Sequence, residues 1–368
     1  MDMDLKVLVI VEDYPRITGK KALMFVHTRN KIYRDGGVEV IVLNFSAREN
    51  YIIDEIPVIT YAEYLEKYAD ERFPVLIAHA ANLRHHFRFI NQHGENFENF
   101  IFFFHGHEIL PINKAYPKPY NYVKESMYIK KIIQNIYDRF KFYEWRKFIN
   151  KYIEKSQFIF VSQWMYSQFQ EWINVDLKKR WHIIYNGVDI SYEEQKYNFI
   201  EECEYEYDCI TIRGNLDGAK YCMDIVNDFA KKNKDLRFLV IGRGDFFSHY
   251  SKSENIKWID RWLNTEEIIE YLRKTKCALM PTKTDAQGLM MCEFATYGIP
   301  VITSDISVCK EVLEGFDNIA YISNENPYLD FKAFFKSLNK SPQINRRFFK
   351  ENTVRKELDL LKKLLEEK

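Results

Sequence analysis

The segment PTKTDAQGLMMCEFATYGIPVITSD (residues 281–305) predicts the end of one strand, a polar loop, a short helix and the start of a second strand. The loop carries Asp285, the helix begins near Gln287 and Gly288, and Gly298 ends it. The free N–H groups at such a helix start, together with the helix dipole, favour a bound anion such as phosphate. This order of elements is typical of a parallel sheet covered by helices.

Within this segment Glu293 is the only charged residue between Asp285 and Asp305, and its sequence neighbours from Leu289 to Ala295 are mostly apolar. A carboxylate on so apolar a helix needs a partner, because burying an unpaired charge is costly. The hydroxyls of a bound ribose would supply that partner, and so would a neighbouring backbone amide. The alternative is a core acid that is satisfied within the protein.

The same alternation of short β-branched or aromatic runs with helix-length segments extends along the whole chain. The strands predicted in the first half span residues 6–12, 38–45, 56–60, 73–79, 99–105, 157–162 and 181–186. Those predicted in the second half span residues 207–213, 236–242, 255–259, 277–282, 299–305 and 318–323. Two successive series of this kind predict an α/β protein with two Rossmann-like domains.

The predicted division has three parts. Residues 1–186 form the first Rossmann-like domain and residues 187–345 the second, because strand pattern gives way to turn residues near Asn186-Gly187-Val188-Asp189. Residues 346–368 form an amphipathic helix. Its apolar positions Val354, Leu358, Leu361 and Leu365 form one stripe, and that stripe needs a surface to cover.

Composition limits the class of protein. The chain has 368 residues, with 53 basic and 53 acidic side chains, so no overall positive charge attracts nucleic acid. Hydrophobic residues make up 46% of the chain, which excludes wholesale disorder. No apolar run approaches the roughly 18–20 residues of a membrane-spanning helix. The acidic start MDMDLK argues against a secretory signal. We therefore expect a cytoplasmic protein, either soluble or peripheral on the inner face of the membrane.

The segment 281–305 resembles the E-x7-E region of retaining GT-B glycosyltransferases (family 4-like, glycosyl transferases group 1), with Asp285 in the place of the first acid and Glu293 in that of the second. Other landmarks of that family follow in order along the chain. They are Gly19 in the loop after the first strand, His105 in FFFHGHE, the turn at 186–189, Arg213, Lys220, and Gly242-Arg243-Gly244. The resemblance implies a GT-B fold with an interdomain cleft and a C-terminal helix that returns to the N-terminal domain.

The resemblance also implies a role for each landmark. Arg213 and Lys220 hold the donor phosphates, Asp285 binds sugar hydroxyls, and His105 lies near the sugar. The implied donor-binding residues are Gly19, Gly242, Gln287, Gly288, Leu289 and Glu293. Cations and amide dipoles suffice to stabilise the leaving phosphate. We therefore expect no metal and no cofactor besides the nucleotide-diphosphate sugar, which is the co-substrate.

Residues 114–155 combine 11 Lys/Arg with 4 Asp/Glu and 11 aromatic residues. Such a mixture fits a surface that lies against anionic lipid headgroups, or a groove for an anionic lipid-linked acceptor. The alternative is an ordinary packed helix whose long side chains extend to solvent. Nucleic acid is excluded as a partner, because no recognised motif accompanies the patch.

These observations predict a glycosyltransferase that moves a hexose, with retention, from a nucleotide-diphosphate donor to a glycan or lipid-linked acceptor in the synthesis of a bacterial surface glycan. Two alternatives remain open. One is a sugar-nucleotide epimerase with the same fold, and the other is a non-catalytic protein that keeps the fold.

Overall fold

The computed structural model describes residues 6–16, 23–124 and 128–366. These residues form two compact units. The first consists of residues up to Pro111, Asn135–Gly187 and the C-terminal segment from Phe349, and the second of Ile112–Gln134 and Val188–Phe348. The predicted Gly19 and the side chain of Leu365 lie outside the described residues.

The described part of the first unit contains one eight-stranded sheet in the order β3-β4-β2-β1-β5-β6-β7-β8. All neighbours pair in parallel except β3 and β4. The strands are β1 (Lys6–Val11), β2 (Glu39–Asn44), β3 (Tyr51–Ile53), β4 (Ile56–Ile59), β5 (Phe73–His79), β6 (Phe97–Phe104), β7 (Ser156–Phe160) and β8 (Trp181–Ile183). All seven strands predicted for this half are present, and the short edge strand β3 was not predicted.

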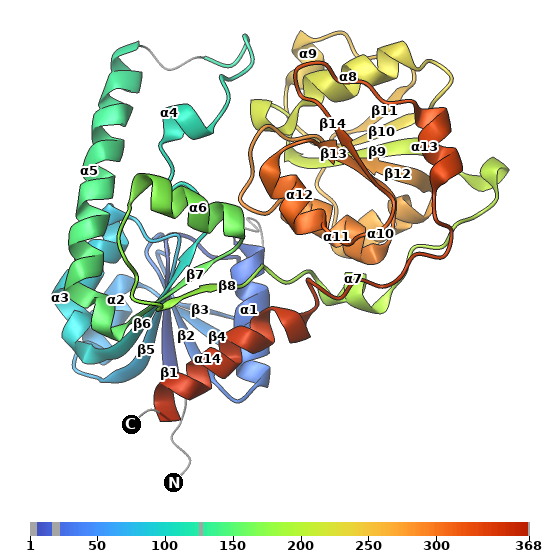
Figure 1. Cartoon of the computed structure of the whole chain (residues 1–368). Helices are drawn as coiled ribbons and strands as arrows, with labels where there is room; N and C mark the ends of the chain where they lie inside the picture. The colour runs from blue at the N-terminus through green and yellow to red at the C-terminus, as the bar shows by residue number, and fades with distance from the viewer. Residues whose placement is uncertain (1–5, 17–22, 125–127, 367–368) are drawn as a thin grey trace. The chain divides into compact units, whose positions relative to one another are not determined.

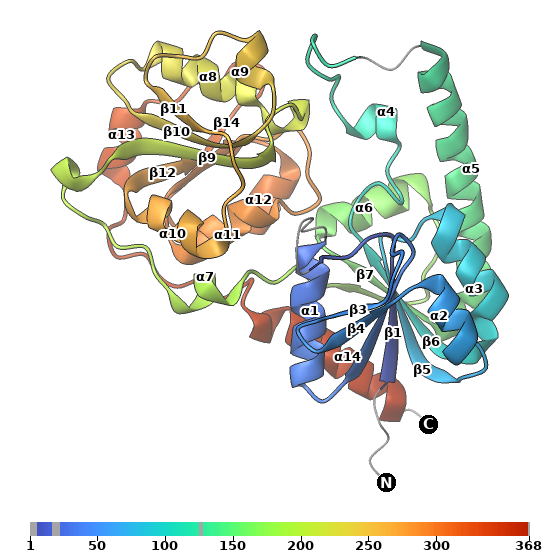
Figure 2. The same ribbon diagram turned by 180° about the vertical axis from the view of Figure 1, so that it is seen from behind.

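Helices cover both faces of this sheet, with α1 and α14 on one side and α2, α3 and α5 on the other (Figures 1 and 2). The helices of this unit are α1 (Met24–Asp35), α2 (Tyr61–Lys67), α3 (Arg88–His93), α6 (Gln163–Trp172) and α14 (Val354–Glu366). Helix α5 (Tyr128–Tyr152) begins in the second unit and ends in the first. Shorter helical turns are Leu83–Phe87, Gly94–Asn96, Ile153–Lys155 and Lys350–Asn352. No helix among the described residues is both long and apolar enough to cross a membrane.

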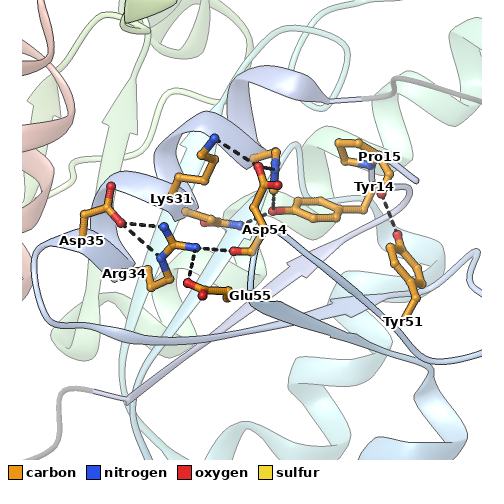
Figure 3. Close-up of polar contacts among 10 residues, drawn as sticks. Tyr14, Pro15, Lys31, Arg34, Asp35, Tyr51, Asp54 and Glu55 are labelled. Atoms are coloured by element: carbon orange, nitrogen blue, oxygen red, sulfur yellow. Dashed lines mark hydrogen bonds and ion pairs between the residues drawn. The ribbon is translucent and has the colours of Figure 1, made fainter. Parts of the chain in front are cut away.

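The two-residue turn between β3 and β4 is held by polar contacts with α1 (Figure 3). Asp54 and Glu55 adopt φ values of +47° and +60°, which suit a hairpin turn but are unfavourable for residues other than glycine. Lys31 binds the Asp54 carboxylate at 3.0 Å, and Arg34 binds the Glu55 carboxylate at 3.2 Å and donates to the Asp54 carbonyl. These contacts offset the backbone strain and fasten the edge hairpin to the helix.

The C-terminal helix α14 packs against α1 and the first sheet, as predicted. Val354, Leu358 and Leu361 are buried in one cluster with the side chains of β1 and β2, and Leu364 completes the stripe. Burial of four aliphatic side chains contributes roughly 1.5–3 kcal/mol each, which explains why this short terminal helix is ordered on the sheet.

A buried ion pair fixes the register of α14 on α1. The guanidinium of Arg29 donates to both carboxylate oxygens of Glu357 at 3.0 Å, and each side chain is 1% exposed. Tyr33 donates a further hydrogen bond to Glu357 at 2.5 Å. Arg29 also donates to the side-chain oxygen of Asn186 at 2.8 Å, so the same pair holds the start of the predicted interdomain turn.

Replacement of Glu357 by alanine is expected to lower the free energy of unfolding by about 3–5 kcal/mol, because it leaves the Arg29 charge buried and unpaired. Denaturant unfolding followed by circular dichroism measures this change. Asp359→Ala, on the exposed side of the same helix, is the matched control and should change stability by less than about 0.5 kcal/mol. Equal stabilities of the two variants would contradict the assignment.

The described part of the second unit contains a six-stranded parallel sheet in the order β11-β10-β9-β12-β13-β14. Its strands are β9 (Tyr207–Asn215), β10 (Phe238–Arg243), β11 (Ile256–Ile259), β12 (Thr275–Leu279), β13 (Val301–Ser304) and β14 (Ile319–Ile322). Its helices are α4 (Ile112–Ala115), α7 (Ile190–Glu194), α8 (Met223–Lys232), α9 (Phe246–His249), α10 (Thr265–Arg273), α11 (Leu289–Tyr297), α12 (Ser307–Leu313) and α13 (Phe331–Ser337), with helical turns at Glu202–Glu204 and Ala219–Tyr221. Helices α8 and α11 lie on opposite faces of the sheet (Figures 1 and 2). The predicted α/β class with two Rossmann-like units is confirmed.

One segment clusters differently from the predicted division. Residues 112–134, which the sequence analysis assigns to the first domain, belong to the second unit. Tyr120 donates to the Asp224 carboxylate at 3.1 Å, and Tyr122 donates to the Asp217 carboxylate at 2.6 Å. Each of these contacts joins residues about one hundred positions apart in the sequence, so no local sequence pattern predicts them.

Candidate active site

Arg213 lies at the carboxyl end of β9, where the strand order of the second sheet reverses between β9 and β12. Ligands of open α/β sheets bind at such a switch point. Arg213 is 7% exposed and donates from Nη2 to the carbonyl of Pro281 at 2.8 Å. Its Nε–H is buried without a partner in the described part of the chain. Burial lowers the pKa of Arg213, and the nearby charge of Asp285 opposes that shift.

Lys220 lies in the helical turn that follows β9, and both Lys220 and Arg213 lie near the ring of Tyr221. The Arg213 guanidinium is 4.8 Å and the Lys220 ammonium 4.6 Å from the centroid of that ring. The Lys220 carbonyl accepts hydrogen bonds from the Lys283 amide at 2.8 Å and from the Thr282 hydroxyl at 3.1 Å. The turn that carries Lys220 is therefore fastened to the loop that carries Asp285.

The loop after β12 ends at Gly288, the N-cap of α11, with φ of +71° and no capping side chain. A Cβ at Gly288 would lie 3.8 Å from an oxygen of the Asp285 carboxylate, so this acid lies beside the helix start. Asp285 also accepts a hydrogen bond from the Ala286 amide at 2.8 Å. The amides of Gly288 and Leu289 precede the first hydrogen bonds within the helix and are available to an anion. The Gln287 side chain is buried against Cys292 below them.

Glu293 lies in the second turn of α11 and has no hydrogen-bond partner within the described residues. Burial raises the pKa of Glu293 to about 8, with a smaller contribution from the negative charge of Asp189. Glu293 is partly exposed, so its carboxyl group is accessible to solvent and to a ligand with hydroxyl donors.

Gly242, near the end of β10, and Gly244, just after it, allow close approach of neighbouring groups. Gly242 has φ of +148°, and a Cβ there would lie 2.0 Å from the Arg213 carbonyl oxygen. Gly244 has φ of +144°, and a Cβ there would lie 2.8 Å from the Asp217 carboxylate. Only glycine fits at Gly242, where the end of β10 approaches the Arg213 carbonyl.

In the first unit, a pair of histidines lies at the carboxyl ends of β5 and β6. The Nδ1 atom of His79 and the Nε2 atom of His105 are 3.1 Å apart. The Glu108 carboxylate accepts hydrogen bonds from the backbone amides of His105 and Gly106, which fixes the turn after β6. Burial lowers the pKa of His105 well below its usual value, and the charge of Arg29 adds to this shift.

The structure thus brings Arg213, Lys220 and Asp285 together within the second unit, and Glu293 lies on α11, which begins beside Asp285. Residues 210–336 of this unit match the family model described as glycosyl transferases group 1. The match covers about a third of the chain, and it confirms the predicted resemblance to the group 1 glycosyltransferases.

Individual relatives and solved structures are consistent with this resemblance. WclY, an O-antigen biosynthesis glycosyltransferase from Escherichia coli, is 26% identical over 176 residues, which cover 45% of this chain and 48% of WclY. The chain spans about half the length of the curated relatives it matches. The structure of sucrose-phosphate synthase from Thermosynechococcus elongatus has a TM-score of 0.68 at 11% identity, covering 99% of this chain and 100% of that one. Anabaena HepE, solved with UDP, has a TM-score of 0.64 at 13% identity and covers 100% of both chains. The likenesses to solved structures show that the chain has the GT-B fold.

Three side chains adjoin the predicted residues and were not themselves predicted. They are Tyr221, whose ring lies near both cations, His79, which contacts His105, and Trp262, which is largely exposed and donates to the Gly214 carbonyl at 3.0 Å. The motif GAKY could have suggested Tyr221, because aromatic rings beside cations are common partners. No spacing in the sequence connects His79 or Trp262 with the motifs.

Proposed function

We propose that this protein transfers a sugar, with retention of anomeric configuration, from a nucleotide-diphosphate donor to a glycan or lipid-linked acceptor in the synthesis of a bacterial surface glycan. The observation that carries the proposal is the approach of two cations, Arg213 and Lys220, to one ring beside the uncapped start of α11. Such an arrangement suits a pyrophosphate. The structure of HepE in complex with UDP supports the donor class, and the role of WclY in O-antigen biosynthesis supports the glycan class.

Each group then has a chemical task. As the bond between the anomeric carbon and the leaving oxygen breaks, negative charge grows on the nucleotide diphosphate. Arg213, Lys220 and the amides of Gly288 and Leu289 stabilise that charge. Asp285 accepts hydrogen bonds from sugar hydroxyls, and Glu293 accepts them from the ribose. The leaving phosphate oxygen takes the proton of the acceptor hydroxyl as the new glycosidic bond forms on the same face.

A panel of nucleotide sugars, tested by thermal shift, identifies the donor, and product analysis by NMR then gives its anomeric configuration. A stabilising donor followed by a retained product supports the proposal. Inversion would refute the retaining mechanism. An altered sugar after incubation with donor alone would identify an epimerase, and binding without turnover on any acceptor would identify a non-catalytic protein.

We further propose that helix α5 binds an anionic membrane surface, where a lipid-linked acceptor would lie. One stripe of α5 is apolar and exposed, and its spacing follows the helical repeat. Its members are Ile129, Ile132, Ile133, Ile136, Phe140 and Tyr143. Lys130 and Arg139 flank the stripe and are exposed, which matches the composition of interfacial helices.

The double substitution Ile133→Ser and Ile136→Ser is expected to weaken flotation with anionic vesicles at least about tenfold, because each buried isoleucine contributes roughly 1.5–3 kcal/mol. These two side chains are 59% and 61% exposed, so the fold should not depend on them. Ile52→Ser, at a position that is 63% exposed on β3, is the matched control. Equal flotation of the wild type, the double variant and Ile52→Ser would refute the membrane proposal. That result would not bear on the proposed glycosyl transfer.

A further inference from the structure

The environment of His79 restricts what this side chain can do. It is 1% exposed at the end of β5 and stacks on Phe103, with ring centroids 4.3 Å apart. Its Nδ1 atom contacts His105 Nε2 at 3.1 Å, and its Nε2 atom is buried without a partner in the described part of the chain. His79 therefore has a single hydrogen-bond partner among these residues, and that partner is His105.

Both rings of this pair are neutral near pH 7. Burial is the main cause that lowers the pKa of His79 and of His105 well below the usual value. The positive charge of Arg29, from α1, acts on both rings in the same direction, and His86 and His107 add smaller shifts. Two neutral imidazoles 3.1 Å apart share one hydrogen, so one ring donates and the other accepts.

The unpaired Nε2 atom of His79 indicates which of the two rings, His79 or His105, donates the shared hydrogen. If His105 donated, His79 would carry its own hydrogen on Nε2, and a buried N–H would be left without an acceptor. If His79 donates from Nδ1, its Nε2 carries only a lone pair. Buried unpaired donors are rarer in proteins than incompletely satisfied acceptors. The second arrangement is therefore favoured, and it places the hydrogen of His105 on Nδ1.

We infer that His79 is a positioning residue that donates to His105 Nε2 and so makes His105 present an Nδ1–H donor to the ligand. The inference rests on the proposed function only for the identity of that ligand. The Nδ1 atom of His105 has no partner among the described residues, and the ring is partly exposed. The group that His105 meets must then be a hydrogen-bond acceptor, such as a sugar hydroxyl oxygen, and His105 does not act as a general base.

Long-range nitrogen-15 NMR of the ligand-free full-length protein tests the inference directly, with His105→Gln to assign the signals. We expect a neutral His105 with hydrogen on Nδ1 between pH 6 and 8. In His79→Leu the hydrogen should redistribute toward Nε2, whereas His79→Asn, whose amide can donate in place of Nδ1, should retain it on Nδ1. His86→Leu is the matched control, because His86 is a histidine of the same unit that is equally buried.

Turnover supplies a second readout. His79→Leu should lower kcat/KM roughly tenfold, as expected for a misoriented contact, with partial recovery in His79→Asn and no change in His86→Leu. A wild-type His105 with hydrogen on Nε2, a charged His105 at pH 7, or a tautomer unchanged by His79→Leu would each overturn the inference. These NMR outcomes need no sugar transfer, so failure of the proposed function would appear separately, as an absence of turnover on every donor.

Discussion

Arg213→Ala is expected to lower turnover roughly 100- to 1,000-fold, the usual effect of removing one preorganised donor from a site of developing negative charge. The reason lies in the setting of the guanidinium at the end of β9. One of its N–H groups already holds the Pro281 carbonyl, and its buried Nε–H has no partner in the described residues. A phosphate oxygen that accepts from Arg213 would satisfy a group that the protein leaves unpaired.

Arg213→Lys tests whether charge alone suffices. Lysine keeps the positive charge but loses the planar fork, so we expect only partial recovery of turnover and of the donor-induced thermal shift. Arg237→Ala is the matched control, because Arg237 belongs to the same unit but pairs with Asp208 before β10 begins. Full turnover in a correctly folded Arg213→Ala protein, measured by circular dichroism and a steady-state assay, would remove Arg213 from the site.

The fold was largely predictable because parallel strands are buried on both faces. Such strands need β-branched and aromatic residues at successive positions, and thirteen of these runs are visible in the sequence. The missed strand, Tyr51–Ile53, is a three-residue edge strand with only partial burial, so selection for apolar residues there is weak. The C-terminal stripe was equally visible, because a helix that covers a sheet needs apolar residues on one face only.

The candidate site was predictable where the backbone dictates the residue. Gly242 and Gly288 occupy conformations or spaces that a side chain would disturb, so glycine is required there and can be recognised in the sequence. The partner of a side chain cannot be recognised in this way. Tyr122 binds Asp217 and His79 binds His105 because the folded chain brings them together, and many other residues at those positions would have suited the local structure equally well.

Glu293→Gln is expected to raise the free energy of unfolding of the ligand-free protein at alkaline pH, because it removes a carboxylate whose charge is disfavoured in the folded state. The carboxyl has a pKa of about 8 in the folded protein and an ordinary value of 4.5 when unfolded, so the unfolded state releases the proton first. Stability is therefore unaffected by Glu293 below pH 4.5, falls as the pH rises toward 8, and stays at its lower level above. Urea unfolding at several pH values measures this profile. In Glu293→Gln that decline should disappear, whereas Glu270→Gln, an exposed glutamate on α10, should follow the wild-type curve.

The same carboxyl links donor binding to proton release. Ribose hydroxyls bond more strongly to a carboxylate than to a protonated acid, so a bound nucleotide lowers the pKa of Glu293 from about 8. Near pH 7 the unliganded group is mostly protonated, and binding must therefore expel a proton. Calorimetric titration in two buffers of different ionisation enthalpy should detect this proton release in the wild type. In Glu293→Gln the release should be absent, and the affinity for the nucleotide should be roughly tenfold lower. A binding enthalpy independent of buffer would show that the nucleotide does not contact Glu293, and the unpaired carboxyl on α11 would then need a different partner.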